Sequence, residues 1–176
     1  MAEKLPVTSL PYRPCVGVAV FNRDGRVWIG RRVEESRPIE GQGKWWQMPQ
    51  GGIDGSEEPL AAALRELYEE TNIRSVELLA ELPGWLSYDF PADLLADKSR
   101  LRGFRGQKQK WFAFRLTGPD SEIDIAHPAG GTARPEFADW RWENLSRLPD
   151  LIVAFKRDVY REVVRAFDRF ARVEPR

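Results

Sequence analysis

GGIDGSEEPLAAALRELYEETNI, which runs from Gly51 to Ile73, is the stretch that decides the fold of this chain. A glycine-rich turn precedes glutamates at positions 57, 58, 66, 69 and 70, with Arg65 embedded among them. Carboxylates held this close repel one another, so a fold that gathers them needs a positive partner. A divalent cation supplies the most concentrated positive charge available. The stretch therefore predicts a metal site.

The second half of the stretch has the pattern of a helix from Glu58 to Thr71. Ser56 is expected to cap its N-terminus, and Pro59 fits the tolerance of the first turn for proline. Leucines recur at helical spacing and predict the side that packs into a core: Leu60, Leu64 and Leu67.

The glutamates of this helix occupy a different face from the leucines. Glu66, Glu69 and Glu70 stand at positions i, i+3 and i+4, which places them side by side. A solvated face with internal ion pairs is the ordinary explanation for such acids. Arg65 is the only cation within the helix, however, so internal pairing leaves most of the charge uncompensated. The pattern thus favours a helix that presents carboxylates to a ligand.

Composition restricts the class of protein. The chain has 176 residues, 42% of them hydrophobic, which suits one ordered globular domain. Lys plus Arg (27) equals Asp plus Glu (27), so no global basic field attracts nucleic acid. The single cysteine, Cys15, excludes an intramolecular disulfide and is expected to be a buried small apolar residue.

No apolar run approaches the roughly 18 residues that a membrane span needs. The N-terminus has no apolar leader segment either. We expect a cytoplasmic protein without membrane contact, and no obligate protein partner is evident.

The remaining chain alternates apolar runs with turn residues. Asn22 to Gly25 is expected to be a hairpin turn between two strands. The expected strands are Cys15–Asn22, Val27–Gly30, Val76–Leu82, Trp85–Phe90, Trp111–Leu116 and Phe137–Trp142. An amphipathic stripe from Ile152 to Phe170 predicts a terminal helix. The sequence indicates one α+β domain over residues 1–176, with a core from about 10 to 172 and a mixed sheet between helices.

The usual catalytic side chains are scarce. His127 is the only histidine and precedes a proline in a loop, so a catalytic triad or a histidine-ligated zinc site has little material. Oxygen ligands remain, and these select Mg²⁺ or Mn²⁺, which typically bridge carboxylates to substrate phosphates. Hydrolysis of a phosphoanhydride by an activated water is the natural reaction for such a site.

These residues reproduce a known motif almost completely. Gly51, Glu57 and the run from Arg65 to Ile73 resemble the Nudix box, G-x5-E-x7-R-E-U-x-E-E-x-G-U, in which U is a bulky aliphatic residue. The one departure is Asn72, where the family has glycine. That position is expected to be a left-handed helix cap, for which Asn is the next-best residue after Gly.

The resemblance to the Nudix family assigns roles within the box. It implies that the metal is held by four groups: the Gly51 carbonyl and the carboxylates of Glu66, Glu69 and Glu70. It also implies that Glu57 pairs with Arg65 and joins the loop to the helix. The presence of Asn72 in place of the family's glycine removes none of these metal ligands.

Segments outside the box are similar to a bacterial branch of the family that contains RNA 5′-pyrophosphohydrolases and asymmetric dinucleoside tetraphosphate hydrolases. These segments are Tyr12–Asn22, Ile29–Arg32, Trp46–Asp54, Tyr88–Pro91, Arg105–Phe112, Pro135–Trp142 and Val153–Val163. In that branch an acid outside the box completes the site. Glu122 matches it, as a metal ligand or as general base for the attacking water. The alternative, which we favour less, is an ordinary acid at the end of a loop.

The resemblance also implies a substrate-binding set. It comprises Arg13, Arg31, Gln50, Tyr88, Lys108, Lys110 and Phe137. The cations are expected to converge on a triphosphate, Arg31 and Phe137 to enclose a base, and Tyr88 to stack on another. The basic stretch from Lys98 to Lys110 could follow an RNA backbone. For each cation alone, a solvated surface position is an equal alternative.

The sequence thus predicts a Nudix hydrolase that uses Mg²⁺ or Mn²⁺ to convert the 5′-triphosphate end of RNA to a monophosphate, with release of pyrophosphate. Dinucleoside polyphosphates are the alternative substrates, because the two activities would use the same catalytic residues. A non-catalytic nucleotide sensor on a Nudix scaffold is a third possibility, which the complete set of box carboxylates disfavours.

Overall fold

The computed structural model of the chain describes residues 6–33, 46–96 and 103–172. Its strands are β1 (Tyr12–Phe21), β2 (Val27–Arg32), β3 (Trp46–Gln47), β4 (Gln50–Gly52), β5 (Val76–Glu81), β6 (Leu86–Asp89), β7 (Gly106–Leu116) and β8 (Phe137–Glu143). Its α-helices are α1 (Pro59–Thr71), α2 (Ala92–Ala96), α4 (Pro128–Gly131), α5 (Leu148–Leu151) and α6 (Arg157–Phe167). Short 3₁₀ helices include η2 (Asp120–Glu122) and η4 (Ala154–Lys156).

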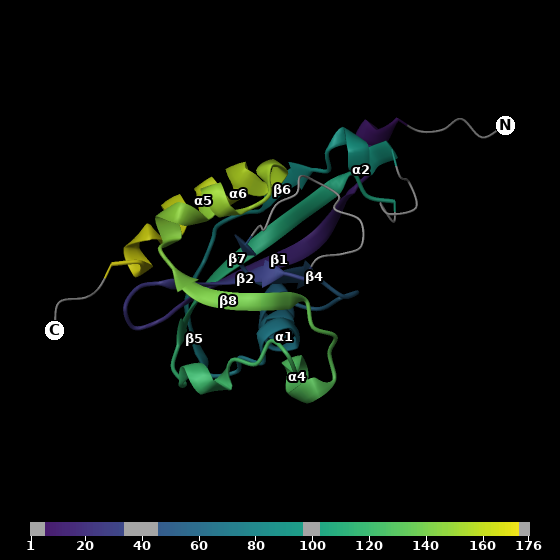
Figure 1. Ribbon diagram of the computed structural model, residues 1–176. Coiled ribbons are helices and arrows are strands. Elements are labelled where there is room, and N and C mark those ends of the chain that lie inside the picture. The colour runs from purple at the N-terminus through teal and green to yellow at the C-terminus, as the bar shows by residue number, and fades with distance from the viewer. Residues whose placement is uncertain (1–5, 34–45, 97–102, 173–176) are drawn as a thin grey trace.

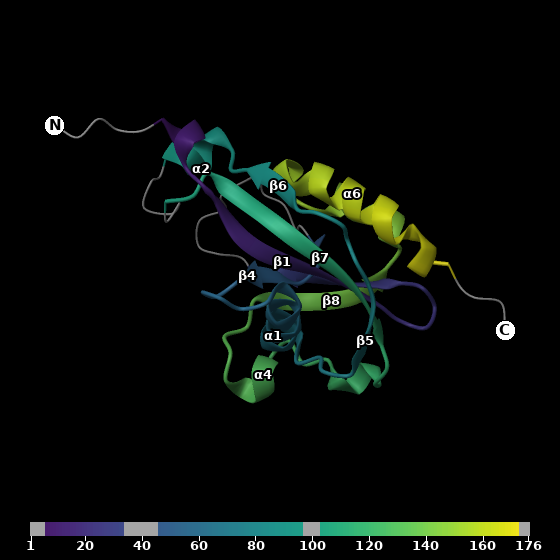
Figure 2. The same ribbon diagram turned by 180° about the vertical axis from the view of Figure 1, so that it is seen from behind.

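The strands form one mixed sheet (Figure 1). The central path runs β3-β2-β1-β7-β5, while β4 pairs with β1, β6 with β7 and β8 with β2. The long strands β1 and β7 are parallel along their length, and the other pairings are antiparallel. Helix α6 covers one face of the sheet and α1 the other (Figures 1 and 2). The predicted α+β architecture, a mixed sheet between helices, is confirmed.

Strand β1 is buried on both faces, which explains its nearly continuous apolar sequence. Successive side chains of a strand point to opposite faces. Val16, Val18 and Val20 accordingly belong to the core beneath α1. Ala19 and Phe21 belong to the core beneath α6. The sheet thus separates two cores.

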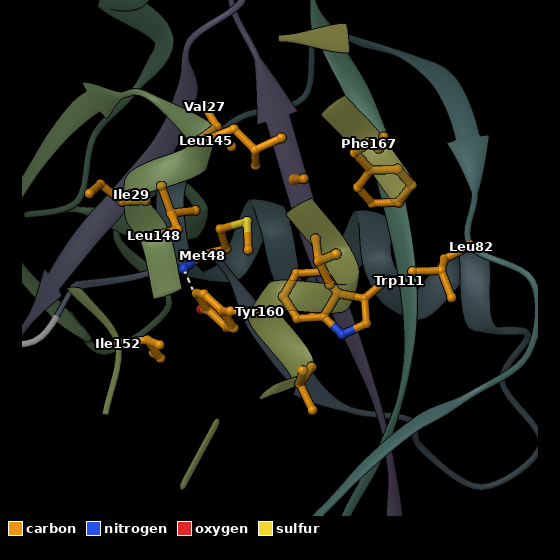
Figure 3. Packing of buried hydrophobic residues seen from close by; sticks show 14 of the residues in the cluster. Val27, Ile29, Met48, Leu82, Trp111, Leu145, Leu148, Ile152, Tyr160 and Phe167 are labelled. Carbon is orange, nitrogen blue, oxygen red and sulfur yellow. Dashed lines mark hydrogen bonds between the residues drawn. The ribbon is translucent and has the colours of Figure 1, made fainter. Parts of the chain in front are cut away.

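The core beneath α6 fixes the segment that leads into β4 (Figure 3). Trp111 and Tyr160 meet edge to face with ring centroids 5.7 Å apart. The Tyr160 hydroxyl accepts a hydrogen bond of 2.9 Å from the Met48 amide. This bond ties α6 to the chain just before the glycine-rich turn.

Helix α1 packs differently from the prediction. Leu60 and Leu64 are 37% and 41% exposed, and the buried apolar residues are Ala62, Ala63 and Leu67. Small alanine side chains allow the helix to lie close to the sheet, so the expected leucine stripe is confirmed at Leu67 and wrong at Leu60 and Leu64. The expected Ser56 cap is also wrong, because the N-cap is Glu58, without a side-chain cap bond.

The left-handed cap at Asn72 is confirmed, with φ of 67° and ψ of 4°. Its side chain also joins two other segments. The amide nitrogen donates to the Glu122 carbonyl at 3.1 Å, and the amide oxygen accepts from the Gly130 N–H at 3.0 Å. Asn72 therefore cross-links η2 and α4 to the end of α1, which glycine could not do.

The other expected elements are present, but β7 begins at Gly106 instead of Trp111. The hairpin between β1 and β2 turns at Gly25, where φ is 71°. The terminal helix is interrupted, since η4 precedes α6 and another 3₁₀ turn follows Phe167. Most of the loop from Val33 to Lys44, and the basic residues from Lys98 to Arg102, lie outside the described residues. Within the described ranges, no helix combines the length and apolarity that a bilayer crossing requires.

Candidate functional site

The glutamate face of α1 turns inward, toward β4. Glu70 is only 3% exposed, and its carboxylate accepts a hydrogen bond of 3.2 Å from the Gln50 N–H. The carboxylate of Glu66 lies directly against Gly51, where any side chain would overlap it. A side chain at position 51 would therefore push the Glu66 carboxylate out of this place.

Arg65 cross-links the carboxylates around the turn. Its Nε and Nη2 donate to the two oxygens of Glu57, each at 2.9 Å. Its Nη1 donates to Glu66 at 2.8 Å and to Glu69 at 3.1 Å, and Nη2 also reaches the Gly52 carbonyl at 2.8 Å. These bonds lower the pKa of Glu57. The implied pairing of Glu57 with Arg65 is present in this geometry.

Two of these carboxyl groups have raised pKa values. Burial raises the pKa of Glu66, although the bond from Arg65 opposes this. Burial raises the pKa of Glu70 well above its usual range, and the charges of Glu136 and Glu66 raise it further. The surroundings of Glu66 and Glu70 therefore do not provide enough positive charge to stabilise the two carboxylates in their anionic forms.

This shortage of positive charge fits a divalent cation. Within the described ranges, no three acidic, histidine or cysteine side chains lie close enough together to hold a metal ion in this arrangement. Arg65 holds an oxygen of Glu66 and one of Glu69. Oxygen donors on adjacent turns of one helix, with Glu70 buried beside them, are suited to Mg²⁺ or Mn²⁺.

The structure does not bring Glu122 to this face. Its carboxylate accepts bonds from the Arg74 N–H at 3.2 Å, from the Ser75 N–H at 3.2 Å and from the Ser75 hydroxyl at 3.0 Å. Glu122 therefore caps the turn that follows α1, beyond the C-terminal end of the helix.

Glu136 is the acid that the structure brings to the glutamate face instead. Its charge raises the pKa of both Glu66 and Glu70. It is exposed, and it lies just before β8. Sequence reasoning missed it, although it stands in the segment PEFADWRW, which is similar to the bacterial branch of the family.

The expected cations do not all converge. Burial raises the pKa values of Cys15 and Tyr88, and the charge of Arg13, which faces the α6 side, opposes both shifts. Lys108 and Lys110 alternate with Gln107, the strand partner of Arg13, so they point to the other face of the sheet.

The lysines of β7 also have partners there. The ammonium of Lys110 lies 2.8 Å from a Glu81 oxygen and donates to the Leu82 carbonyl at 2.9 Å. That of Lys108 lies 5.3 Å from the centre of the Trp85 ring. Arg31 lies half-buried in β2, opposite Asp139 of β8. The prediction that all four cations converge on one phosphate chain is therefore wrong in the case of the two lysines.

The expected stacking aromatics are buried. Tyr88 is 7% exposed and packs on Phe90 and Phe155. Phe137 is 2% exposed and packs on Trp28 at 5.2 Å. Neither ring offers an open face to a base in this structure, because each fills one of the two cores.

Lys156 is a buried cation that the sequence did not reveal. It is 7% exposed, and its ammonium lies 5.6 Å from the Tyr88 ring centre and 5.9 Å from that of Phe155. Burial lowers its pKa to about 8, while Glu70 and Glu136 oppose the shift. Lys156 thus adds a positive charge near the carboxylates, opposite α1.

A family model settles the classification. The model described as "NUDIX domain" matches residues 11–163, which is most of the chain. This chain belongs to the NUDIX domain family. The Nudix box expected from the sequence is therefore the correct frame for the glutamate face, and the chain is a Nudix hydrolase.

Relatives of this Nudix hydrolase share most of its length. A protein of Azorhizobium caulinodans named RNA pyrophosphohydrolase is 54% identical over 163 residues, covering 93% of this chain and 96% of the relative. A Brucella anthropi protein of the same name is 55% identical over 161 residues, covering 90% of this chain and 91% of the relative.

Solved structures show the same fold at low identity. The E. coli dihydroneopterin triphosphate pyrophosphohydrolase superposes with a TM-score of 0.62 at 19% identity, covering 89% of this chain and 99% of that one. An Ap4A hydrolase of C. elegans superposes with a TM-score of 0.56 at 17% identity, covering 88% of this chain and 98% of that one. These similarities establish a shared Nudix fold and nothing finer.

Proposed function

We propose that this Nudix hydrolase is an RNA 5′-pyrophosphohydrolase. The observation that carries the proposal is the identity of about 54% with proteins of that name over nearly the full length of both chains. Water would cleave the anhydride bond between the α- and β-phosphates, leaving a 5′-monophosphate on the RNA and releasing pyrophosphate. We infer a cytoplasmic location from that substrate.

We further propose that Glu66, Glu69 and Glu70, with the Gly51 carbonyl, hold Mg²⁺ or Mn²⁺. Such an ion neutralises phosphate charge and activates water when bound. The raised pKa values of Glu66 and Glu70 support the assignment, because a cation would restore their charge balance. Arg65 holds the helix to the glycine turn and so keeps the carboxylates in place.

Other side chains of the site suit the remaining tasks. Glu136 is exposed, its charge acts on Glu70, and it would accept the proton of the attacking water. Arg13 and Lys156 lie on the α6 side of the sheet and would contact phosphate oxygens through charge-assisted hydrogen bonds. Phe155 is half-buried next to Lys156 and is better placed to contact a base than Tyr88 is.

The decisive experiment incubates the pure protein and Mg²⁺ with triphosphorylated RNA and, in parallel, with diadenosine tetraphosphate. Release of pyrophosphate at the higher kcat/KM from RNA supports the proposal. A higher kcat/KM on diadenosine tetraphosphate assigns the alternative activity. No turnover of either substrate would sink both and favour a nucleotide sensor.

Glu69→Gln is the matched variant for the metal assignment. Glu69 is 44% exposed at its side chain, so the fold should survive the change. We expect turnover to fall by about a thousandfold or more, since one ligand charge is lost. Unchanged turnover would show that the ligands are assigned incorrectly.

A further inference from the structure

A chain of amide hydrogen bonds runs from the core to the site. The Trp111 indole N–H donates to the side-chain oxygen of Gln109 at 3.1 Å. The Gln109 amide nitrogen donates to the side-chain oxygens of Gln50 at 3.1 Å and of Gln107 at 3.0 Å. Gln109 is 1% exposed, and Trp111 is fully buried.

The chain of bonds has only one consistent direction. An indole N–H can donate but cannot accept, so the Gln109 atom that faces it must be the oxygen. The NH₂ group of Gln109 must then face Gln50 and Gln107, and each of these must present its oxygen to it. A rotated amide at either position would place two NH₂ groups together and leave a buried donor unsatisfied.

The NH₂ groups of Gln50 and Gln107 are consequently turned away from Gln109. Both residues are half-buried. Neither amide nitrogen is among the buried polar atoms without a partner, and within the described ranges neither donates to another residue. Both NH₂ groups therefore remain accessible as donors.

These two donors lie at the site. The main-chain N–H of Gln50 already binds the Glu70 carboxylate. Gln107 lies between Arg13 of β1 and Tyr88 of β6 in the sheet. Phosphate oxygens only accept hydrogen bonds, so a site for a phosphate chain gains from groups that cannot turn an acceptor toward it.

We propose that Trp111 and Gln109 are positioning residues that lock Gln50 and Gln107 into a donor-only orientation toward the phosphate chain of the substrate. The inference rests on the proposed function for the identity of that substrate. The orientation itself follows from the hydrogen bonds within the protein. A freely rotating glutamine would present its carbonyl oxygen in part of the population, and that oxygen would repel a phosphate oxygen.

Gln109→Glu reverses the chain of bonds at almost constant shape. The carboxylate accepts hydrogen bonds only, so Gln50 and Gln107 must turn their NH₂ groups inward and their oxygens outward. We expect KM for triphosphorylated RNA to rise about tenfold or more, with a smaller change in kcat. Trp111→Phe removes the indole donor without adding charge and should raise KM by a few fold.

Trp142→Phe is the matched control for the tryptophan variant. Its indole N–H also makes one side-chain bond, to Asp120 at 2.9 Å, outside the described site. We expect KM to stay within about twofold of the wild type, since no amide of the site depends on it.

The orientation is measured directly by NMR of the side-chain amides in the whole protein. In the wild type, the NH₂ protons of Gln109 should exchange slowly with solvent because they are hydrogen-bonded. Those of Gln50 and Gln107 should exchange quickly with solvent. In Gln109→Glu, the protons of Gln50 and Gln107 should become slow. If Gln109 had only a structural role, its replacement would not slow the exchange of the Gln50 and Gln107 protons.

The outcomes separate the inference from the proposed function. Rapid exchange at Gln109 in the wild type overturns the inference, and so does a raised KM in Gln109→Glu without protection of Gln50 and Gln107, which would reflect charge alone. If Gln109→Glu does not fold, the wild-type spectrum and the KM of Trp111→Phe still decide. A wild type that shows the expected exchange but releases no pyrophosphate from RNA refutes the proposed function and supports the orientation.

Discussion

Replacement of Lys156 by methionine should stabilise the folded protein and weaken its binding of substrate. The lysine is 7% exposed, and burial is the largest cause of its lowered pKa of about 8, against an ordinary 10.5. That difference corresponds to roughly 3 kcal/mol of unfavourable free energy for the charged form at neutral pH. The contacts of the ammonium with the Tyr88 and Phe155 rings offset part of it, so we expect a net gain of about 2 kcal/mol for Lys156→Met.

The sign of the pH dependence follows from linkage. Between pH 8 and 10.5 the unfolded chain holds the Lys156 proton more tightly than the folded chain, so wild-type stability rises with pH in that window. Below pH 8 the whole cost of the buried charge is present. The advantage of Lys156→Met should therefore be full at pH 7 and should shrink as the pH approaches 10.

The assay is thermal unfolding in EDTA at pH 7 and at pH 10. A gain of about 2 kcal/mol corresponds to a rise in Tm of about 4 to 8 °C for a chain of this size. Arg161→Met is the control on the same helix, since Arg161 is exposed and pairs with Asp158 at 2.9 Å. Its effect should stay within about 0.5 kcal/mol at both pH values.

Kinetics complete the test of Lys156. Loss of one charge-assisted bond to a phosphate should raise KM for triphosphorylated RNA by about 10- to 100-fold. Absence of a stability gain at pH 7, or an equal gain at pH 10, would refute the reasoning from the buried charge. An unchanged KM would remove Lys156 from the substrate site.

Three further predictions concern acids and the helix cap. Glu136→Gln should lower kcat by about a hundredfold or more, whereas Glu122→Gln should keep kcat within a few fold, measured by pyrophosphate release; equal effects would contradict the geometry. In EDTA at pH 7, Glu70→Gln should raise Tm because burial disfavours the carboxylate in the folded state, and the gain should disappear at a pH low enough to protonate Glu70 in both states. Asn72→Gly keeps the left-handed cap but loses two side-chain bonds, so thermal unfolding should show a loss of about 1–2 kcal/mol. A gain in stability would show that these two bonds contribute nothing.

The local parts of the fold were predictable from sequence because they depend on near neighbours. Short apolar runs predicted most of the strands, and turn residues located the hairpin at Gly25. The same spacing argument failed for the leucines of α1. Periodicity shows which residues share a face, but it does not show that Ala62 and Ala63 allow a closer approach to the sheet than Leu60 and Leu64 would.

Residues far apart in sequence were the weakest predictions for the site. Glu122 and Glu136 are both acids of irregular segments, and nothing local distinguishes them. The path of the chain decides between them, because Glu122 caps the turn at Ser75, whereas the charge of Glu136 raises the pKa values of Glu66 and Glu70. The burial of Lys156 was not predictable from the local sequence either, since it depends on how η4 packs against β6.

By itself, the sequence from Gly51 to Ile73 determined the arrangement of carboxylates on one helix, since helical spacing alone places positions 66, 69 and 70 together. It also determined the left-handed turn at Asn72. Only the tertiary structure decided what surrounds those carboxylates. Parallel pairing of β1 with β7 places the Gln109 side chain within hydrogen-bonding distance of Gln50 in β4 and turns Lys108 and Lys110 to the other face. Such long-range pairing leaves no local signature, because it depends on contacts between segments rather than on the spacing within one.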